Sequence, residues 1–145
     1  MVAQDFNAKV VYLDAAPLIY YIEEHPDYLP KLDPLFWENG QGHVAFVTSS
    51  ISLLEVLVGP VKHGLHELVY IYQQIFKTSA GLSVHKVDNQ IATTAARLRA
   101  FYNLAASDSL QAATAIETGA DYFLTNDKKL RRLQAEIPVV TLDDL

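Results

Sequence analysis

The stretch DYFLTNDKKL, residues 121–130, joins a short apolar run to an acidic and then a basic segment. The run Tyr122–Leu124 has the aromatic and apolar character of a buried β-strand. Thr125 and Asp127 follow it, and two lysines come next. This order predicts a strand that delivers a carboxylate to the edge of a sheet, with a short helix beginning directly after it.

Similar short apolar runs recur along the chain, and helical patterns separate them. The predicted strands are residues 10–13, 44–48, 82–84, 122–125 and 138–142. The predicted helices start near Pro17 and Tyr28, then cover residues 49–60 and 64–76, and start again near Asp88, Asp108 and Lys128. Strands that alternate with helices predict an α/β domain with a mainly parallel sheet.

Two helix boundaries carry specific expectations. Gly59 and Pro60 are predicted to stop the helix that begins near residue 49, because glycine and proline favour helix ends. Asp108 and Gln111 form a D-x-x-Q pattern, which resembles a capping box at the start of a helix. On that interpretation Asp108 is an N-cap and Gln111 its capping partner.

The composition is that of one folded domain, residues 1–145. Half of the residues are hydrophobic and 19% are charged, so disorder is not expected. The absence of cysteine excludes disulfides and thiol chemistry. No apolar run approaches the length of a membrane span, and the N-terminus lacks the pattern of a signal peptide. We therefore expect a cytoplasmic protein.

Charge is unevenly distributed between the two halves of the chain. The formal net charge is −6, which disfavours broad binding to a phosphate backbone. Residues 1–72 contain three Lys or Arg and nine Asp or Glu, whereas residues 73–145 contain eight of each. The second half can therefore form a local basic rim, with Lys128, Lys129, Arg131 and Arg132 as candidates.

Four carboxylates are predicted to meet at one edge of the sheet. In parallel sheets, ligands bind outside the carboxyl ends of the strands. Asp14 and Asp127 follow predicted strands, Glu55 lies on the helix that leaves a strand, and Asp108 begins the helix that leads into another. Helix capping alone explains Asp14, Asp108 and Asp127 individually, but it does not explain Glu55 within LLEVLV, for which a surface-facing position is the open alternative.

Carboxylates that converge repel one another unless a cation compensates their charge. Oxygen-only ligands suit a hard cation such as Mg²⁺ or Mn²⁺, and one or two such ions can promote hydrolysis of a phosphodiester. The chain contains neither G-x-x-x-x-G-K-[ST] nor G-x-G-x-x-G, so it lacks both glycine-rich phosphate-binding motifs. A phospho-receiver domain is also disfavoured, because Ala15 and Ala16 follow Asp14 where that class has adjacent acids.

Four blocks, in order, resemble the PIN-domain ribonucleases, and most of all the VapC-type toxins of toxin–antitoxin pairs. They are VVYLDAAPLIYYIE, TSSISLLEVLVGP and the continuous stretch LAASDSLQAATAIETGADYFLTNDKKLRRL, which contains the last two. The resemblance covers nearly the whole length. Ala15 and Ser109 depart from residues common in the family, but neither replaces an expected ligand.

The resemblance implies a three-layer α/β/α domain with a central, mainly parallel five-stranded sheet. It also implies metal-dependent hydrolysis of single-stranded RNA, with Asp14, Glu55, Asp108 and Asp127 as catalytic metal ligands. Thr125 would support this cluster, and the basic rim would hold RNA phosphates.

The resemblance further implies a small antitoxin as partner, and the apolar surface of residues 64–76 with Tyr20 and Tyr21 suits that contact or a homodimer. Two alternatives remain open at this point. One is a catalytically silent module that binds RNA or protein, and the other is a nuclease of DNA or of RNA maturation.

Overall fold

The computed structural model describes residues 1–145 and contains a five-stranded sheet in which every neighbouring pair is parallel. The strand order is β3-β2-β1-β4-β5. The strands are β1 (Val10–Leu13), β2 (Ala45–Ser49), β3 (Leu82–His85), β4 (Tyr122–Thr125) and β5 (Val139–Thr141). All five predicted strands are therefore present, and the expectation of a mainly parallel sheet is confirmed.

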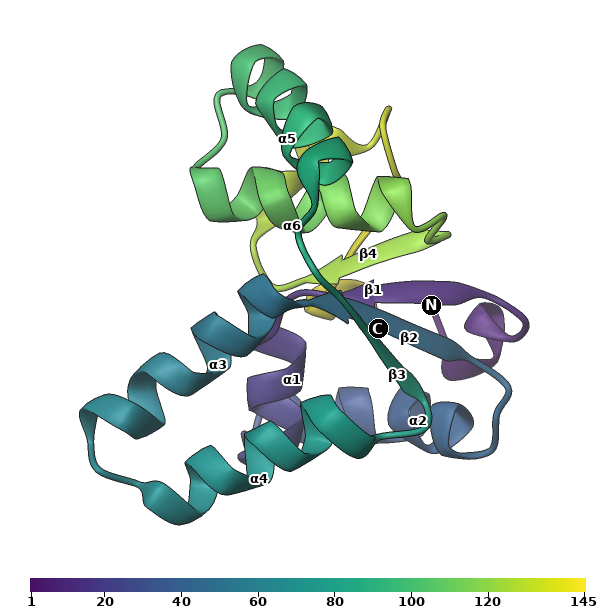
Figure 1. Ribbon diagram of the computed structural model, residues 1–145. Coiled ribbons are helices and arrows are strands. Elements are labelled where there is room, and N and C mark those ends of the chain that lie inside the picture. Colours follow the sequence, from purple (N-terminus) through teal and green to yellow (C-terminus); the bar gives the residue numbers. More distant parts are fainter.

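Six α-helices and three short 3₁₀ helices accompany the sheet (Figure 1). The α-helices are α1 (Ala15–Ile22), α2 (Leu29–Gly40), α3 (Ser50–Lys62), α4 (His66–Thr78), α5 (Asn89–Tyr102) and α6 (Ala106–Glu117). The 3₁₀ helices are η1 (Ala3–Phe6), η2 (Lys128–Leu133) and η3 (Leu142–Asp144). None of the helices combines the length and the apolar composition needed to cross a membrane.

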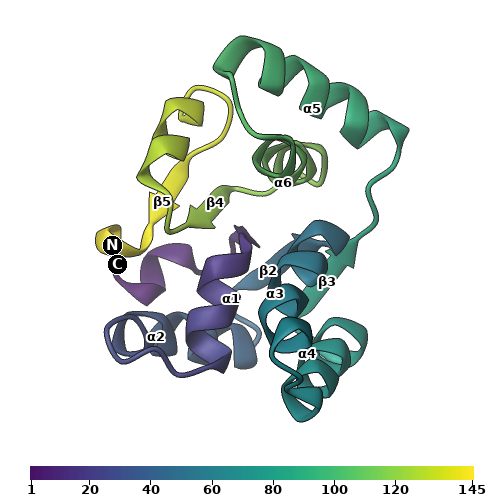
Figure 2. The same ribbon diagram turned by 90° about the vertical axis from the view of Figure 1, so that its left-hand side faces the viewer.

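The helices form two layers, one on each face of the sheet (Figures 1 and 2). Successive side chains of a strand point to opposite faces, and β1 follows this rule. Val11 and Leu13 belong to one buried cluster, together with residues of α1 to α4. Tyr12 belongs to the other, with residues of α5, α6 and η2. The predicted three-layer α/β/α arrangement is thereby confirmed.

The prediction that Gly59 and Pro60 stop the third helix is wrong. Helix α3 continues to Lys62, and it ends where Gly64 adopts a left-handed conformation with φ of +67°. Pro60 lies in the last turn and is buried. A proline there removes one backbone N–H donor, and we attribute the tolerance of that loss to the burial of its ring.

The strand order has a consequence for where a ligand can bind: it reverses direction at β1, in the middle of the sheet. β1 lies between β2 and β4, so the chain runs outward from β1 on both sides. Such a reversal of strand order creates a crevice outside the carboxyl ends of the strands. Figure 2 looks onto this end of the molecule, where α1 and α3 lie below the sheet and α6 lies above it.

Candidate metal-dependent active site

Asp14 and Thr125 meet at the carboxyl ends of β1 and β4. These strands pair in parallel, with Leu13 opposite Leu124, so the residue after β1 lies beside the last residue of β4. The hydroxyl of Thr125 donates to Asp14 Oδ2 at 2.8 Å. The N–H of Ala15 donates to Asp14 Oδ1 at 2.8 Å, which makes Asp14 the N-cap of α1.

Asp127 joins this group through the same hydroxyl. Its backbone N–H donates to Thr125 Oγ1 at 3.1 Å, while its side chain accepts from the N–H of Lys129 at 3.0 Å. Asp127 is therefore the N-cap of η2, as the sequence predicts. Thr125 is fully buried and connects the backbone of Asp127 to the carboxylate of Asp14. The apolar strand of the opening stretch thus places three functional groups together.

Asp108 lies in the first turn of α6, but the predicted capping box does not form. Helix α6 begins at Ala106, and its N-cap is Ala105, which has no capping side chain. Asp108 is the third helical residue, a position that the helix dipole still favours for an acid. Partial burial and then the charge of Asp127 raise the pKa of Asp108, whereas Arg132 and Lys129 oppose that rise.

Glu55 lies in the second turn of α3, and its partner is Gln111 of α6. Gln111 donates from Nε2 to Glu55 Oε1 at 2.9 Å. The amide oxygen of Gln111 accepts from buried hydroxyls of β1 and of the start of α3. Gln111 is therefore a buried partner of a candidate ligand and not a capping residue.

Asp14 is the carboxylate whose ionisation the fold most disfavours. Burial raises the pKa of Asp14 to about 6, and the charges of Glu55 and Asp108 add to the rise. The hydrogen bonds from Thr125 and Ala15 act in the opposite direction but do not cancel it. Together with the effect of Asp127 on Asp108, these interactions place all four acids in one shared electrostatic environment.

The donor set suits a divalent cation in its chemistry. It consists of carboxylate oxygens, which are the ligands that Mg²⁺ and Mn²⁺ prefer, and no basic side chain is bonded to Asp14. As the side chains stand, however, no three Asp, Glu or His residues lie close enough to ligate one ion together. The acids therefore fit a cation by charge and ligand type, and ligation requires them to draw closer.

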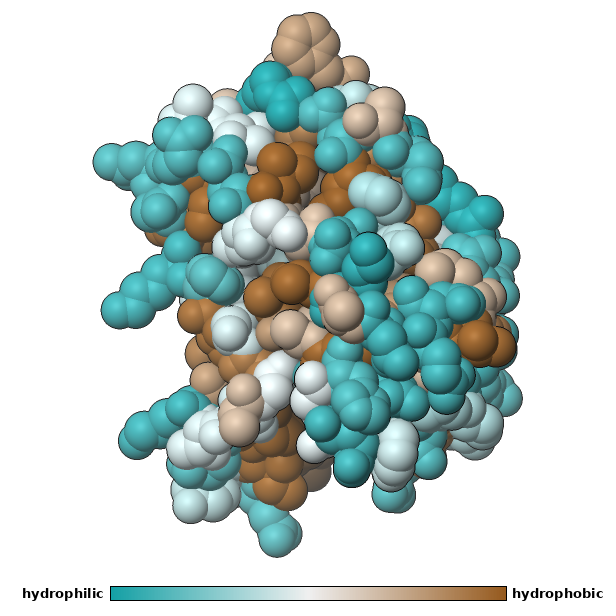
Figure 3. Space-filling model, turned by 90° about the vertical axis from the view of Figure 1, so that its right-hand side faces the viewer, coloured by the Kyte–Doolittle hydropathy of each residue, from teal (hydrophilic) through white to brown (hydrophobic).

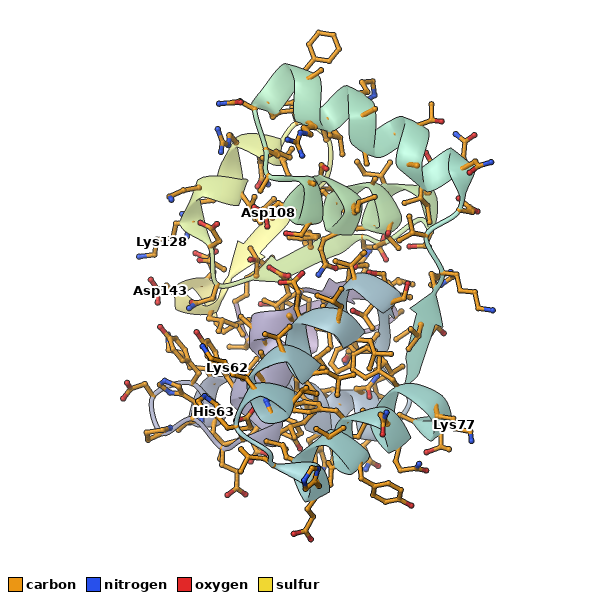
Figure 4. All side chains as sticks on the ribbon, turned by 60° about the vertical axis from the view of Figure 1, so that its left-hand side comes forward. Lys62, His63, Lys77, Asp108, Lys128 and Asp143 are labelled. Atoms are coloured by element: carbon orange, nitrogen blue, oxygen red, sulfur yellow. The ribbon has the colours of Figure 1, made fainter.

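The four predicted phosphate-binding cations divide into two pairs. Lys128 bonds to Asp143 at 2.6 Å, and Arg131 bonds to Asp144 at 3.0 Å, both on the exposed surface. Lys129 and Arg132 make no ion pair and act electrostatically on Asp108. Figure 4 shows Asp108 at the start of α6, with the Lys128–Asp143 pair on the same side of the molecule.

The raised pKa of Asp14 predicts a specific pH dependence of stability. Between about pH 4 and pH 6 the folded protein keeps a proton that the unfolded chain has released, so the free energy of unfolding falls as pH rises through this window. Thermal unfolding of metal-free wild type and of Asp14→Asn from pH 4 to pH 8 isolates this contribution. The stability difference should grow across the window and then level off, and a constant difference would contradict the assignment.

Sequence reasoning missed the polar partners beneath Glu55. The sequence pattern predicts only a strand for Tyr12, a helix start for Ser49 and Ser52, and a capping role for Gln111. A usable signal was present, because Gln111 lies in the run LQAATAI, where a polar residue among small apolar ones is expected to be buried and hydrogen-bonded.

The family comparison agrees with the fold and with the sequence blocks. The model of the PIN domain family matches residues 11–136. No curated protein sequence matches this chain.

Several solved structures share the fold at low sequence identity. VapBC2 from Rickettsia felis, bound to a promoter DNA fragment, is 22% identical with a TM-score of 0.71, covering 91% of this chain and 98% of that one. DNA-bound VapBC from Salmonella typhimurium is 20% identical with a TM-score of 0.69, covering 92% and 98%. A toxin–antitoxin complex from Klebsiella pneumoniae is 20% identical with a TM-score of 0.65, covering 93% and 99%.

These structures establish the likeness of fold, and the family model extends it to most of the sequence. Asp14, Glu55, Asp108 and Asp127 all lie within the matched residues. The chain belongs to the PIN domain family.

Proposed function

We propose that this protein is a divalent-metal-dependent endoribonuclease that hydrolyses single-stranded RNA, and that it is the toxin of a toxin–antitoxin pair in the cytoplasm. The main support is the placement of four acids at the carboxyl edge of a PIN domain, where Asp14 is partly buried beside the negative charges of Glu55 and Asp108. One or two bound divalent cations would relieve the repulsion between these carboxylates. Solved structures that share its fold include a toxin–antitoxin complex and a member of the VapBC family of toxin–antitoxin systems.

Each acid has a distinct place in the proposed site. Asp14 and Asp108 would hold the ion most directly, and Glu55 would complete the cluster or position the nucleophilic water. Asp127 acts directly or through water, and Thr125 fixes Asp14. When bound, Mg²⁺ or Mn²⁺ would lower the pKa of a water molecule that it carries and would stabilise negative charge on the phosphate oxygens.

The basic rim supports binding of a polyanion. Lys129 and Arg132 lie near enough to Asp108 to oppose the rise of its pKa, so a phosphate approaching the acids also meets these two cations. Lys128 and Arg131 are already paired with acids of the C-terminal residues. We therefore assign the first pair to the phosphate nearest the site, and the second pair to a weaker outer contact.

The double variant Lys129→Ala/Arg132→Ala is expected to raise the KM for RNA by about tenfold, because two phosphate contacts are lost. The slope of log KM against log salt concentration should also become shallower by between one and two. The matched control is Lys128→Ala/Arg131→Ala, whose cations are engaged elsewhere and whose effect should be smaller. An equal effect of both double variants would show that the rim acts only through its total charge.

An apolar groove supports the assignment of an antitoxin as partner. It is lined by residues of α1, α2, α4 and the adjoining strands, including Leu18, Tyr21, Phe36, Phe46 and Ile75. Tyr21 and Phe36 stack with 3.8 Å between ring centroids, so the expected exposed aromatic surface of α1 is partly used in packing. The remaining groove suits the apolar face of a short helix.

A second apolar surface supports the assignment of a homodimer. Leu54, Val58 and Val61 are spaced along one side of α3, and they are 60%, 56% and 63% exposed. Tyr70 and Ile71 of the adjacent α4 are also exposed. On the face shown in Figure 3, which lies away from the α3–α4 connection, apolar patches are divided by polar side chains.

The proposal is tested by incubating the protein with cellular RNA and Mg²⁺ or Mn²⁺, with EDTA as control and single-stranded DNA as a parallel substrate. We expect discrete RNA fragments that require the metal and do not form with Asp108→Asn. Cleavage of DNA alone would overturn the assignment of RNA as the substrate. A folded protein that binds RNA without cutting it under these conditions would instead support the binding-module alternative.

A further inference from the structure

A buried polar cluster lies directly behind Glu55 and contains Gln111 at its centre. The side chain of Gln111 is buried, and it lies three residues after Asp108 on the same helix. Its amide oxygen accepts from Tyr12 Oη, from Ser52 Oγ at 3.1 Å and from Ser49 Oγ at 3.4 Å. Residues of two strands and two helices therefore surround one amide group.

The neighbours of Gln111 fix the direction of its amide. The NH₂ group donates to Glu55, and the amide oxygen accepts from the hydroxyls on its other side. The hydroxyl of Tyr12, itself fully buried, donates to that oxygen. A flipped amide would place its oxygen against Glu55, and the present orientation is the one the cluster stabilises.

The contact leaves Glu55 with one oxygen engaged and one available. Gln111 bonds to Oε1 at 2.9 Å, and this is the hydrogen bond that Glu55 makes with the rest of the protein. Gln111 is itself held by three hydroxyls. It can therefore fix the orientation of Glu55, whereas a flexible side chain on the surface could not. With Oε1 held by Gln111, the position of the other carboxylate oxygen of Glu55, Oε2, is restricted as well.

We propose that Gln111 is a positioning residue, which aims Glu55 at the cation and water of the active site and couples α3 to α6. This inference rests on the proposed function. Groups behind a metal ligand that orient it typically contribute tenfold to a hundredfold in metal affinity or activity. Gln111 would thereby link the placement of Glu55 to that of Asp108, which occupies the preceding turn of α6.

Nuclear magnetic resonance tests the contact without metal. In ¹⁵N-labelled protein, the side-chain NH₂ resonances of Gln111 are identified by their disappearance in Gln111→Met. One of the two protons should lie downfield and exchange slowly, and Glu55→Gln should move it upfield. Asp127→Asn, which leaves the contact in place, should move it little. If the chemical shift of the Gln111 NH₂ protons does not change in Glu55→Gln, the inference is wrong, whether or not the protein cleaves RNA.

Manganese titration then tests the positioning role through a double-mutant cycle. Gln111→Met should weaken Mn²⁺ binding about tenfold or more in the wild-type background, but by less than about twofold in the Glu55→Gln background. Thr114→Val is the matched control, because Thr114 is a buried hydroxyl of the same helix that bonds only to the backbone of Leu110. It should leave Mn²⁺ affinity unchanged.

The outcomes separate this inference from the proposed function. An equal loss of affinity in both backgrounds would make Gln111 merely structural and overturn the inference, while RNA cleavage could still occur. A responsive Gln111 resonance in a protein that binds no Mn²⁺ would overturn the metal centre and the positioning role with it. Should Gln111→Met not fold, Tyr12→Phe removes one hydroxyl and should give a smaller loss with the same dependence on Glu55.

Discussion

The variant Asp14→Asn is expected to lose at least about 1,000-fold in RNA cleavage, yet to be more stable than the wild type when both are free of metal. The loss follows because removing a ligand that brings the cation to the phosphate forfeits several kcal/mol of transition-state stabilisation. The gain follows because Asp14 must ionise at neutral pH in a partly buried site, where its pKa is raised to about 6.

The size of the stability gain can be derived from the same shift. The rise from 3.8 to about 6 corresponds to about 3 kcal/mol at pH 7.5, at 1.36 kcal/mol per unit. Asparagine keeps an oxygen that can accept from the N–H of Ala15, so the N-cap of α1 is retained. Denaturant unfolding in EDTA measures the difference. A less stable Asp14→Asn would contradict the inference that the ionised carboxylate of Asp14 destabilises the metal-free fold.

Thr125→Val is expected to reduce RNA cleavage by about tenfold to a hundredfold, with the fold retained. The buried hydroxyl of Thr125 donates to Asp14 and accepts from the N–H of Asp127. Valine removes both contacts at once, so one carboxylate loses its donor and the N-cap of η2 loses its anchor. The free energy of unfolding should fall by about 1–3 kcal/mol, because two buried polar groups lose a partner.

The matched variant is Thr125→Ser, which keeps the hydroxyl and removes only a methyl group. It should retain most of the cleavage activity at a cost of about 1 kcal/mol in stability. Steady-state cleavage rates and urea unfolding of the three proteins give both quantities. Equal activity of the valine and serine variants would exclude a role of the hydroxyl in the site.

The sheet and most of its helices were predictable because their patterns are local. The runs around Val11 and Phe123 read as strands on their own residues, and alternation with helices leaves few arrangements other than a parallel sheet. The grouping of Asp14 with Asp127 follows from that arrangement, since the carboxyl ends of parallel strands share one edge. The capping roles of both residues were likewise readable from the sequence.

The rest depends on contacts between distant parts of the chain. The continuation of α3 through Pro60 is decided by how its ring is buried, which a local pattern does not contain. Asp108 falls in the first turn of α6 and not at its cap, because the helix begins two residues before it. The contact between Gln111 and Glu55 spans 56 residues, and no motif in this sequence announces it.

The basic rim illustrates the same limit. Lys128 and Lys129 are neighbours with identical side chains, and the sequence treats them alike. In the structure Lys128 forms an ion pair with Asp143, whereas the charge of Lys129 acts on Asp108 and opposes the rise of its pKa. The roles of both lysines in RNA binding stay predictions, as do the ligand roles of the four acids.

Whether the four carboxylates hold a divalent cation is tested by a Mn²⁺ titration. Isothermal titration calorimetry of the wild type and of Asp14→Asn, at pH 7.5, is the measurement. We predict saturable binding of one or two Mn²⁺ ions to the wild type, displaced by Mg²⁺, and a loss of that binding in Asp14→Asn. Wild-type protein that binds no Mn²⁺, or an Asp14→Asn variant that binds it equally well, would show that these carboxylates do not form a metal site.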